Sequence, residues 1–133
     1  MSVQFKAILR GEPGVEGGGE KKYYALALSS GSHSLLKLST YICKATTVNK
    51  TDVLAVLSSL VEFMAIELAD GKIIRLGDLG SLRISIHSEG VLLKEDLNES
   101  CIKGASIIFT PGKDLKNLLK ILDYELVKDK EEE

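Results

Sequence analysis

Three polar side chains, Arg75, Ser81 and Arg83, lie close together in the stretch KIIRLGDLGSLRISI (residues 72–86). Two guanidinium groups and a hydroxyl beside a glycine-containing turn are groups that commonly bind phosphate. Arg83 alternates with apolar neighbours, so its side chain must point away from their face. The pattern predicts either an anion-binding surface or, equally well, a cation that protects a strand edge from aggregation.

A second group of cations follows in FTPGKDLKNLLK (residues 109–120). Thr110 can cap a helix whose first residue is Pro111, so that the free amides at the helix start lie near Lys113. The exposed stripe of this helix carries Lys113, Lys116 and Lys120. The opposite, buried stripe carries Leu115, Leu118, Leu119 and Leu122. Phosphate contact is expected at Lys113 more than at Lys120, and the alternative is a solvated helix face.

No other pattern supports catalysis or a bound metal. The loop GEPGVEGGGEK (residues 11–21) is rich in glycine, but it lacks the GxxxxGK[ST] motif and its three glutamates would repel phosphate. A flexible loop is expected instead. His33 and His87 are isolated, and no serine or cysteine lies in a nucleophile motif such as GxSxG. We expect a protein that is not an enzyme, with no cofactor, no metal and no small-molecule substrate.

The composition is that of one small intracellular domain. The chain has 133 residues and 44% apolar content, which suffices for a single core. Its formal net charge is −2, so any nucleic-acid contact must rest on local patches. Cys43 and Cys101 lack CxxC spacing, which fits a reducing compartment. The first residues lack the apolar core of a signal peptide, and a cytoplasmic location is expected.

Hydrophobic patterns predict the elements of the first half. Residues 3–10 and 22–29 are rich in strand formers and predict an N-terminal β-hairpin. Ser34 can cap a helix that ends near Thr46. The buried stripe of this helix is expected to consist of Leu35, Leu38, Ile42 and Ala45.

A second, longer helix is predicted from Asn49 to about Asp70. Asn49 is a good N-cap, Asp52 suits the positive end of the helix dipole, and Gly71 can stop the helix. Of the 16 residues 53–68, 12 are apolar. This run is too short for a membrane span, and a helix apolar nearly all round must be covered on several sides. Homodimerisation is the expected solution.

The second half is predicted to be mainly β-structure. Strands are expected at 72–76 and 82–86, joined by the turn Gly77-Asp78-Leu79-Gly80-Ser81. Residues 88–104 interrupt the pattern as an extended arm or irregular excursion, and a strand resumes at 105–109. The charged residues beyond 124 are expected to fray.

This order of elements, with RLGDLGSLRI and FTPGKDLKNLL, resembles the bacterial HU/IHF family of nucleoid-associated DNA-binding proteins. The similarity covers roughly residues 34–122. The usual glycine-aromatic-glycine turn of the family is altered, because Asp78 and Leu79 occupy its first two positions. The N-terminal strands indicate a variant HU-like subfamily, so we expect a hairpin extension at 1–33, the HU/IHF-like domain at 34–127 and a charged tail at 128–133.

The resemblance implies an α+β fold, an intertwined homodimer and largely sequence-independent binding of double-stranded DNA, with bending or compaction in the nucleoid. The implied DNA-binding residues are Arg75, Ser81, Arg83, Lys103, Gly112, Lys113 and Lys116. Family arms usually end in a proline that wedges between bases, but residues 88–104 contain no proline and no arginine. Four acids in this arm would oppose phosphate, so weaker binding is expected. The alternative is an HU-like dimeric protein-interaction or structural module with little DNA affinity.

Overall fold

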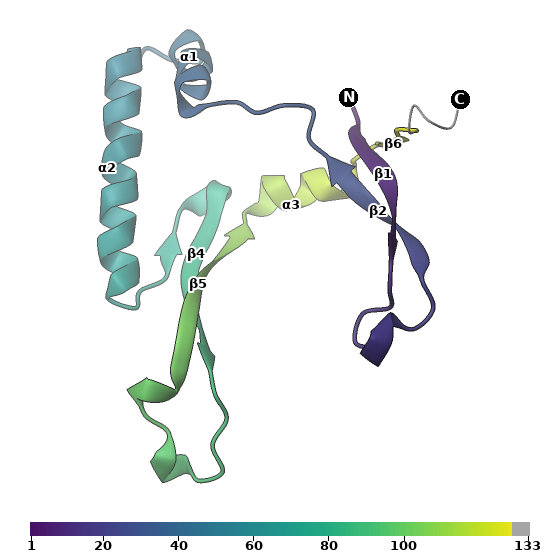
Figure 1. Ribbon diagram of the computed structural model, residues 1–133. Helices are drawn as coiled ribbons and strands as arrows, with labels where there is room; N and C mark the ends of the chain where they lie inside the picture. The colour runs from purple at the N-terminus through teal and green to yellow at the C-terminus, as the bar shows by residue number, and fades with distance from the viewer. Residues whose placement is uncertain (129–133) are drawn as a thin grey trace. The chain divides into compact units, whose positions relative to one another are not determined.

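The computed structural model describes residues 1–128, and its contacts divide the chain into two units (Figure 1). One unit is formed by Met1–Ser34 together with the described residues from Leu119 onward. The other comprises Leu35–Leu118. Each unit contains a three-stranded sheet, with strand orders β2-β1-β6 and β3-β4-β5 respectively. With its three α-helices, this part of the chain has the predicted α+β class.

The N-terminal hairpin is confirmed. Strands β1 (Val3–Arg10) and β2 (Lys22–Leu28) pair antiparallel along their length. The loop between them contains a short 3₁₀ turn at Glu16–Gly18, and Glu12 forms an ion pair with Lys22 at 3.3 Å. A further strand, β6 (Tyr124–Leu126), pairs parallel to β1, and the amide of Val127 donates to the carbonyl oxygen of Phe5, so the chain does not fray directly beyond Tyr124 as expected. Residues 129–133 of the charged tail lie outside the described residues.

The two N-terminal helices form where predicted, but the expected buried stripe of the first one is not buried. Its residues Leu35, Leu38, Ile42 and Ala45 are exposed in the single chain, and Ser39 is the buried residue of this helix. Helix α1 (Leu35–Ala45) contacts α2 (Lys50–Ala69). Asn49 caps α2, because its side-chain oxygen accepts a hydrogen bond from the amide of Asp52 at 2.9 Å.

Gly71 stops helix α2. It has a φ of 80°, and its amide donates to the carbonyl oxygen of Leu68 while the amide of Lys72 donates to that of Glu67. This pair of bonds is the Schellman motif that glycine favours at helix ends. The ammonium of Lys72 also lies 3.1 Å from the carboxylate of Glu67, which raises the pKa of this lysine.

The β3-β4-β5 sheet differs from the prediction at its ends. Strand β3 (Ile74–Arg75) is shorter than expected, whereas β4 (Gly80–Ser88) and β5 (Ile102–Pro111) are longer. Thr110 and Pro111 pair with β4 as part of β5, so Thr110 is not the helix cap and Pro111 is not the first helical residue. The two-strand ladder prevails over the local helix-start signal because it adds cross-strand pairs that a cap cannot supply.

Helix α3 therefore begins later than predicted and spans Lys113–Lys120. It ends before Leu122, so the expected fourth leucine of the buried stripe lies outside the helix. Leu115, Leu118 and Leu119, which were expected to form a buried stripe, are exposed in the single chain. None of the described helices is long and apolar enough to cross a membrane.

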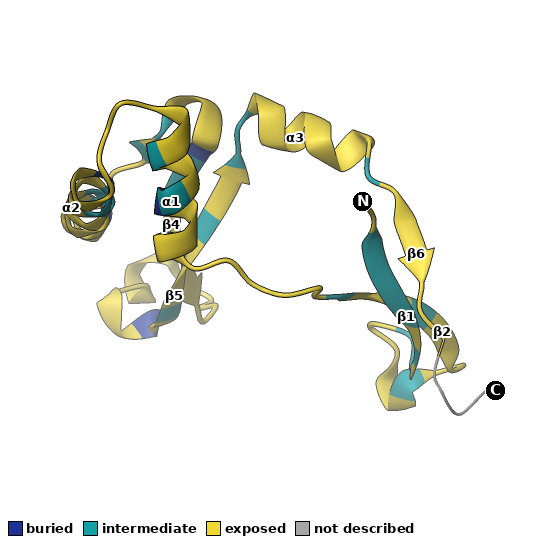
Figure 2. Cartoon of the chain, turned by 90° about the horizontal axis from the view of Figure 1, so that it is seen from above, coloured by how far each residue is buried: buried dark blue, intermediate teal, exposed yellow. Residues whose placement is uncertain are grey.

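Little of the described chain is buried (Figure 2). Val53, Leu68 and Cys101 are its buried apolar side chains, whereas Phe63 on α2 remains 66% exposed. The chain exposes 11,389 Å² to solvent, compared with about 6,800 Å² for a compact monomer of this mass. An interface between the two units, typically about 600–1,500 Å², would not remove this excess. The apolar surfaces of the chain are thus not covered by the chain itself.

Candidate functional site

A row of polar side chains crosses the β3-β4-β5 sheet. Arg75 on β3 lies opposite Ser81 on β4, and Ser81 lies opposite Thr110 on β5. Residues paired in this way place their side chains on the same face of a sheet. Arg83 and Ser85 continue this face along β4, because alternate residues of a strand lie on the same face.

The same polar face extends toward the far end of β4. The ring Nε2 of His87 lies 3.4 Å from the hydroxyl of Ser106 on β5. The opposite face is apolar throughout, and its side chains are Ile74, Leu82, Ile84, Ile86, Ala105, Ile107 and Phe109. Apart from Ile108, which lies opposite Arg83, the first face carries polar side chains, so the sheet is amphipathic, with one face suited to a polar ligand and the other to a hydrophobic partner.

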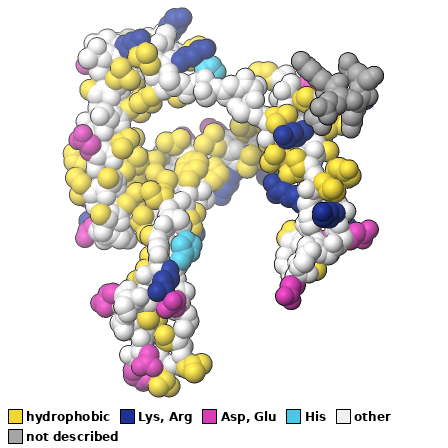
Figure 3. Space-filling view, viewed as in Figure 1, with side chains coloured by type: hydrophobic (Ala, Val, Ile, Leu, Met, Phe, Trp, Pro, Cys, Tyr) yellow, Lys and Arg dark blue, Asp and Glu magenta, His cyan; other side chains and the backbone are white. Residues whose placement is uncertain are grey.

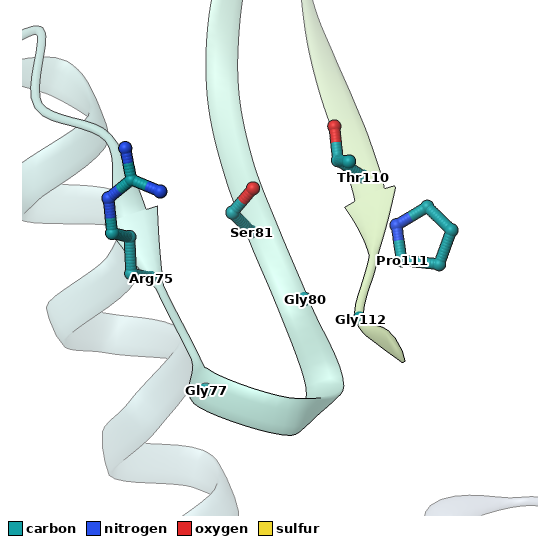
Figure 4. A pocket seen from close by; sticks show the side chains of 7 residues that line it. All are labelled: Arg75, Gly77, Gly80, Ser81, Thr110, Pro111 and Gly112. Atoms are coloured by element: carbon teal, nitrogen blue, oxygen red, sulfur yellow. The ribbon is translucent and has the colours of Figure 1, made fainter. Parts of the chain in front are cut away.

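The row of polar side chains lies beside a cavity of approximately 290 Å³. Its lining residues are Arg75, Gly77, Gly80, Ser81, Thr110, Pro111 and Gly112. Figure 4 shows Arg75, Ser81 and Thr110 in a row across the three strands, with their polar ends on the same side. A guanidinium group and two hydroxyls together offer several hydrogen-bond donors to one anionic ligand.

The glycines at this cavity allow the backbone to approach closely. The amide of Gly112 donates to the carbonyl oxygen of Leu79 at 3.1 Å, which links the β3–β4 turn to the start of α3. A Cβ added at Gly112 would overlap the carbonyl of Asp78, and one at Gly80 would overlap that of Thr110. Gly80 also has a φ of 136°, which L side chains rarely adopt. Both glycines therefore hold the cavity in its shape.

Helix α3 starts directly beside this cavity. Lys113 is its first residue, and the amide of Lys116 donates to the carbonyl oxygen of Gly112 at 2.9 Å. The preceding amides at the helix start have no acceptor within the helix, so they can donate to an anion. Asp78 in the turn and Asp114 in the first helical turn bring negative charge to the same region.

The structure brings most of the sequence-predicted site residues into one region. Arg75, Ser81 and Gly112 line the cavity, and Lys113 is adjacent to Gly112. Two further predicted residues lie next to this group. Arg83 is two residues beyond Ser81 on β4, and Lys116 is about one helical turn beyond Lys113 on α3. The sequence analysis did not identify Thr110 as a site residue. Its signal is the register with Ser81, which a single sequence does not fix.

Lys103 is not part of this group. It lies at the other end of β5, about 24 Å from Thr110 by the rise per residue of a strand. Its ammonium pairs with the carboxylate of Glu89 at 3.1 Å, and the amide of Glu89 donates to the carbonyl oxygen of Cys101 at 2.9 Å. These contacts hold together the base of the arm, residues 89–101.

The arm is a folded loop rather than an extended strand pair. It contains the 3₁₀ turns Lys94–Asp96 and Glu99–Cys101, and Cys101 is buried within it. Leu92 is fully exposed, with an accessibility of 104%. Figure 3 shows acidic and hydrophobic side chains together at the tip of the arm. This surface is chemically unlike the cavity region.

Within residues 1–128, no group of three or more histidine, cysteine, aspartate or glutamate side chains could hold a metal ion.

The comparisons with known proteins concern most of the chain. The model of the HU-HIG family, described as an HU domain fused to wHTH, Ig, or Glycine-rich motif, matches residues 1–125. A crystal structure from Bacteroides vulgatus, described as a candidate bacterial DNA-binding protein, is similar with a TM-score of 0.60 and 16% sequence identity. The similarity covers 96% of this chain but only 49% of that one, and it supports the fold. No curated protein matches the sequence.

Proposed function

Because this chain belongs to the HU-HIG family, we propose that it binds double-stranded DNA, without catalysing a reaction, through the polar face of the β3-β4-β5 sheet and the start of α3. The observation that carries the proposal is the row of Arg75, Ser81 and Thr110 beside the free amides and Lys113 of α3. Such donors bind phosphate oxygens. Because every sequence presents the same phosphates, this binding is largely independent of sequence.

The active form in this proposal is an intertwined homodimer. The apolar face of the sheet and helix α2 are both open in the single chain (Figure 2). Helix α2 also carries an apolar groove of about 400 Å³, lined by Ala55, Val56, Ser59, Leu60 and Phe63. A second copy would cover these surfaces through an isologous interface, because each copy brings the same apolar faces.

The dimer would present each cation of the site twice. Arg75, Arg83, Lys113 and Lys116 then supply about eight phosphate contacts, which corresponds to a slope of log K against log salt of about −7. The arm has no proline to insert between base steps. Bending or compaction of DNA must therefore come from wrapping of the duplex along this surface. In this role the protein is a nucleoid component of the cytoplasm.

A titration of the full chain against a random-sequence duplex at low salt tests the proposal. Fluorescence anisotropy should show binding at micromolar protein or below, and affinity should change little when the duplex sequence is changed. Absence of binding at micromolar protein would refute it.

A second candidate function is supported by the arm. Its exposed Leu92 and its acids Glu95, Asp96 and Glu99 suit a protein partner better than a polyanion. In this alternative, the chain is an HU-like dimeric interaction module with little DNA affinity. Co-purification of one defined partner through the arm, combined with absent DNA binding in the same titration, would favour it.

A further inference from the structure

The β1–β2 hairpin carries a cationic face that the site described above does not include. Alternation along β1 places Lys6 and Arg10 on one face of the strand, and the register places Lys22 of β2 directly opposite Arg10. We call these three residues the hairpin cationic face. The same face carries Ile8 opposite Tyr24 between the cations, and Leu26 lies opposite Lys6.

The opposite face of the same sheet carries no charge. The residues on that face are Val3, Phe5, Ala7, Leu9, Tyr23, Ala25, Ala27, Tyr124 and Leu126. The charges of the strands are thus confined to a single side of the sheet, which leaves the other side free for apolar packing.

The acids of this region lie mainly away from the cationic face. Glu12, Glu16 and Glu20 are all in the loop between the strands, and Figure 3 shows acidic side chains near the tip of the hairpin and cations along it. Glu12 pairs with Lys22 at 3.3 Å. Glu125 on β6 lies beside Gln4, on the cationic side, and accepts a hydrogen bond from Ser2.

Two of the three cations have no acidic partner among the described residues. Within residues 1–128, neither Lys6 nor Arg10 forms an ion pair, and Arg10 is exposed. Arg10 and Lys22 are like charges directly opposite each other, and Glu12 offsets only Lys22. With Glu12 paired to Lys22 and Glu125 beside Gln4, the described part of the face keeps a small excess of positive charge, at Lys6 and Arg10, that a bound anion would offset.

The spacing of the cations indicates the kind of anion. Lys6 and Arg10 are four residues apart on one strand, which is about 13 Å. A single small anion cannot contact both groups, whereas the repeated phosphates of a polymer can. The tyrosine between them adds a hydroxyl donor and an aromatic surface.

We propose that the hairpin cationic face is a second contact surface for the DNA backbone, which extends the length of duplex bound by each protomer. This inference rests on the proposed DNA-binding function. It assigns the N-terminal extension a role in affinity and footprint, separate from the sheet and the α3 start.

The test is a double substitution, Lys6→Gln with Arg10→Gln, in the full chain. On a long random duplex, loss of two phosphate contacts per protomer should reduce affinity about tenfold or more at low salt and lower the salt slope by about 1.8 per protomer. The charge-keeping variant Lys6→Arg with Arg10→Lys should bind as the unaltered protein does.

Two controls separate charge removal from other effects. Lys44→Gln with Lys50→Gln removes the same charge near the connection between α1 and α2, and it should leave the affinity nearly unchanged. Far-UV circular dichroism and light scattering should show that the hairpin variant remains folded and does not aggregate.

The outcomes distinguish this inference from the function on which it rests. If the unaltered protein fails to bind DNA, the proposed function fails. If it binds and the hairpin variant binds equally well, the inference alone is overturned. Equal loss of affinity in the Lys44 and Lys50 control would also overturn it, because the effect would then be one of net charge. A variant that binds DNA normally but aggregates would assign the cations to protection of the strand edge instead.

Discussion

Replacing Lys113 by glutamine should weaken DNA binding in a salt-dependent way. Lys113 is the first residue of α3 and follows Gly112, whose amide links the helix start to the β3–β4 turn. The substitution removes one phosphate contact per protomer, and two per dimer. Each contact contributes about 0.9 to the slope of log K against log salt, so the slope should decrease by about 1.8.

This change of slope predicts a specific pattern of affinities. Between 50 and 200 mM salt, the affinity of the unaltered protein should fall about tenfold more than that of the Lys113 variant. The reason is that the two slopes differ by about 1.8 and the salt concentration rises fourfold. Fluorescence anisotropy over a salt series with a random-sequence duplex measures both slopes. The loss should be the same on unrelated duplex sequences, since a phosphate contact does not read bases.

Lys120→Gln is the matched control on the same helix. Lys120 is the last residue of α3, about 10 Å along the helix axis from Lys113 and away from the free amides. It should change the slope much less. An unchanged slope for the Lys113 variant, or equal effects of the two substitutions, would show that α3 does not bind phosphate through its N-terminus.

Three further predictions follow from the same surfaces. Gly112→Ala should destabilise the fold by about 2 kcal/mol or more, measured by urea unfolding, because its Cβ would overlap the carbonyl of Asp78; unchanged stability would show that the turn can move. Phe63→Asp should convert a dimer to monomer in light scattering, and a persistent dimer would exclude α2 from the interface. Asp78→Asn should raise DNA affinity at low salt, whereas Glu95→Gln on the arm should not; an equal gain from both would contradict a local effect.

The sequence predicted the elements whose signals are local. Asn49 and Gly71 mark the two ends of α2 through backbone bonds within a few residues, and both assignments are confirmed. The alternation in β4 likewise requires only its own residues. These signals are reliable because the residues that decide between the competing conformations lie within a few positions of each other in the sequence.

The parts that the sequence did not predict depend on contacts between distant residues. Thr110 carries a helix-cap signal, but its pairing with Ser81 keeps it in β5 and places its hydroxyl at the cavity. Strand β6 is three residues long and forms only by pairing with β1, more than 100 residues earlier in the chain. A local pattern of that length does not distinguish a strand from a loop. The cations near the cavity could therefore be predicted from the sequence, but the alignment of Arg75, Ser81 and Thr110 across three strands could not.

The net charge of −2 does not decide whether this surface binds a polyanion. The Debye length is about 8 Å at physiological salt, so exposed charges act mainly on their immediate surroundings. Glu89 and the other acids of the arm follow Ser88, which lies about 24 Å along β4 from Ser81, and their repulsion is largely screened at the cavity. Asp78 and Asp114 lie beside the cavity, so their charges are screened less there than those of the arm. The balance of these two acids against Arg75, Arg83, Lys113 and Lys116 therefore sets the affinity of the site, and the acidity of the arm determines only what the arm itself can contact.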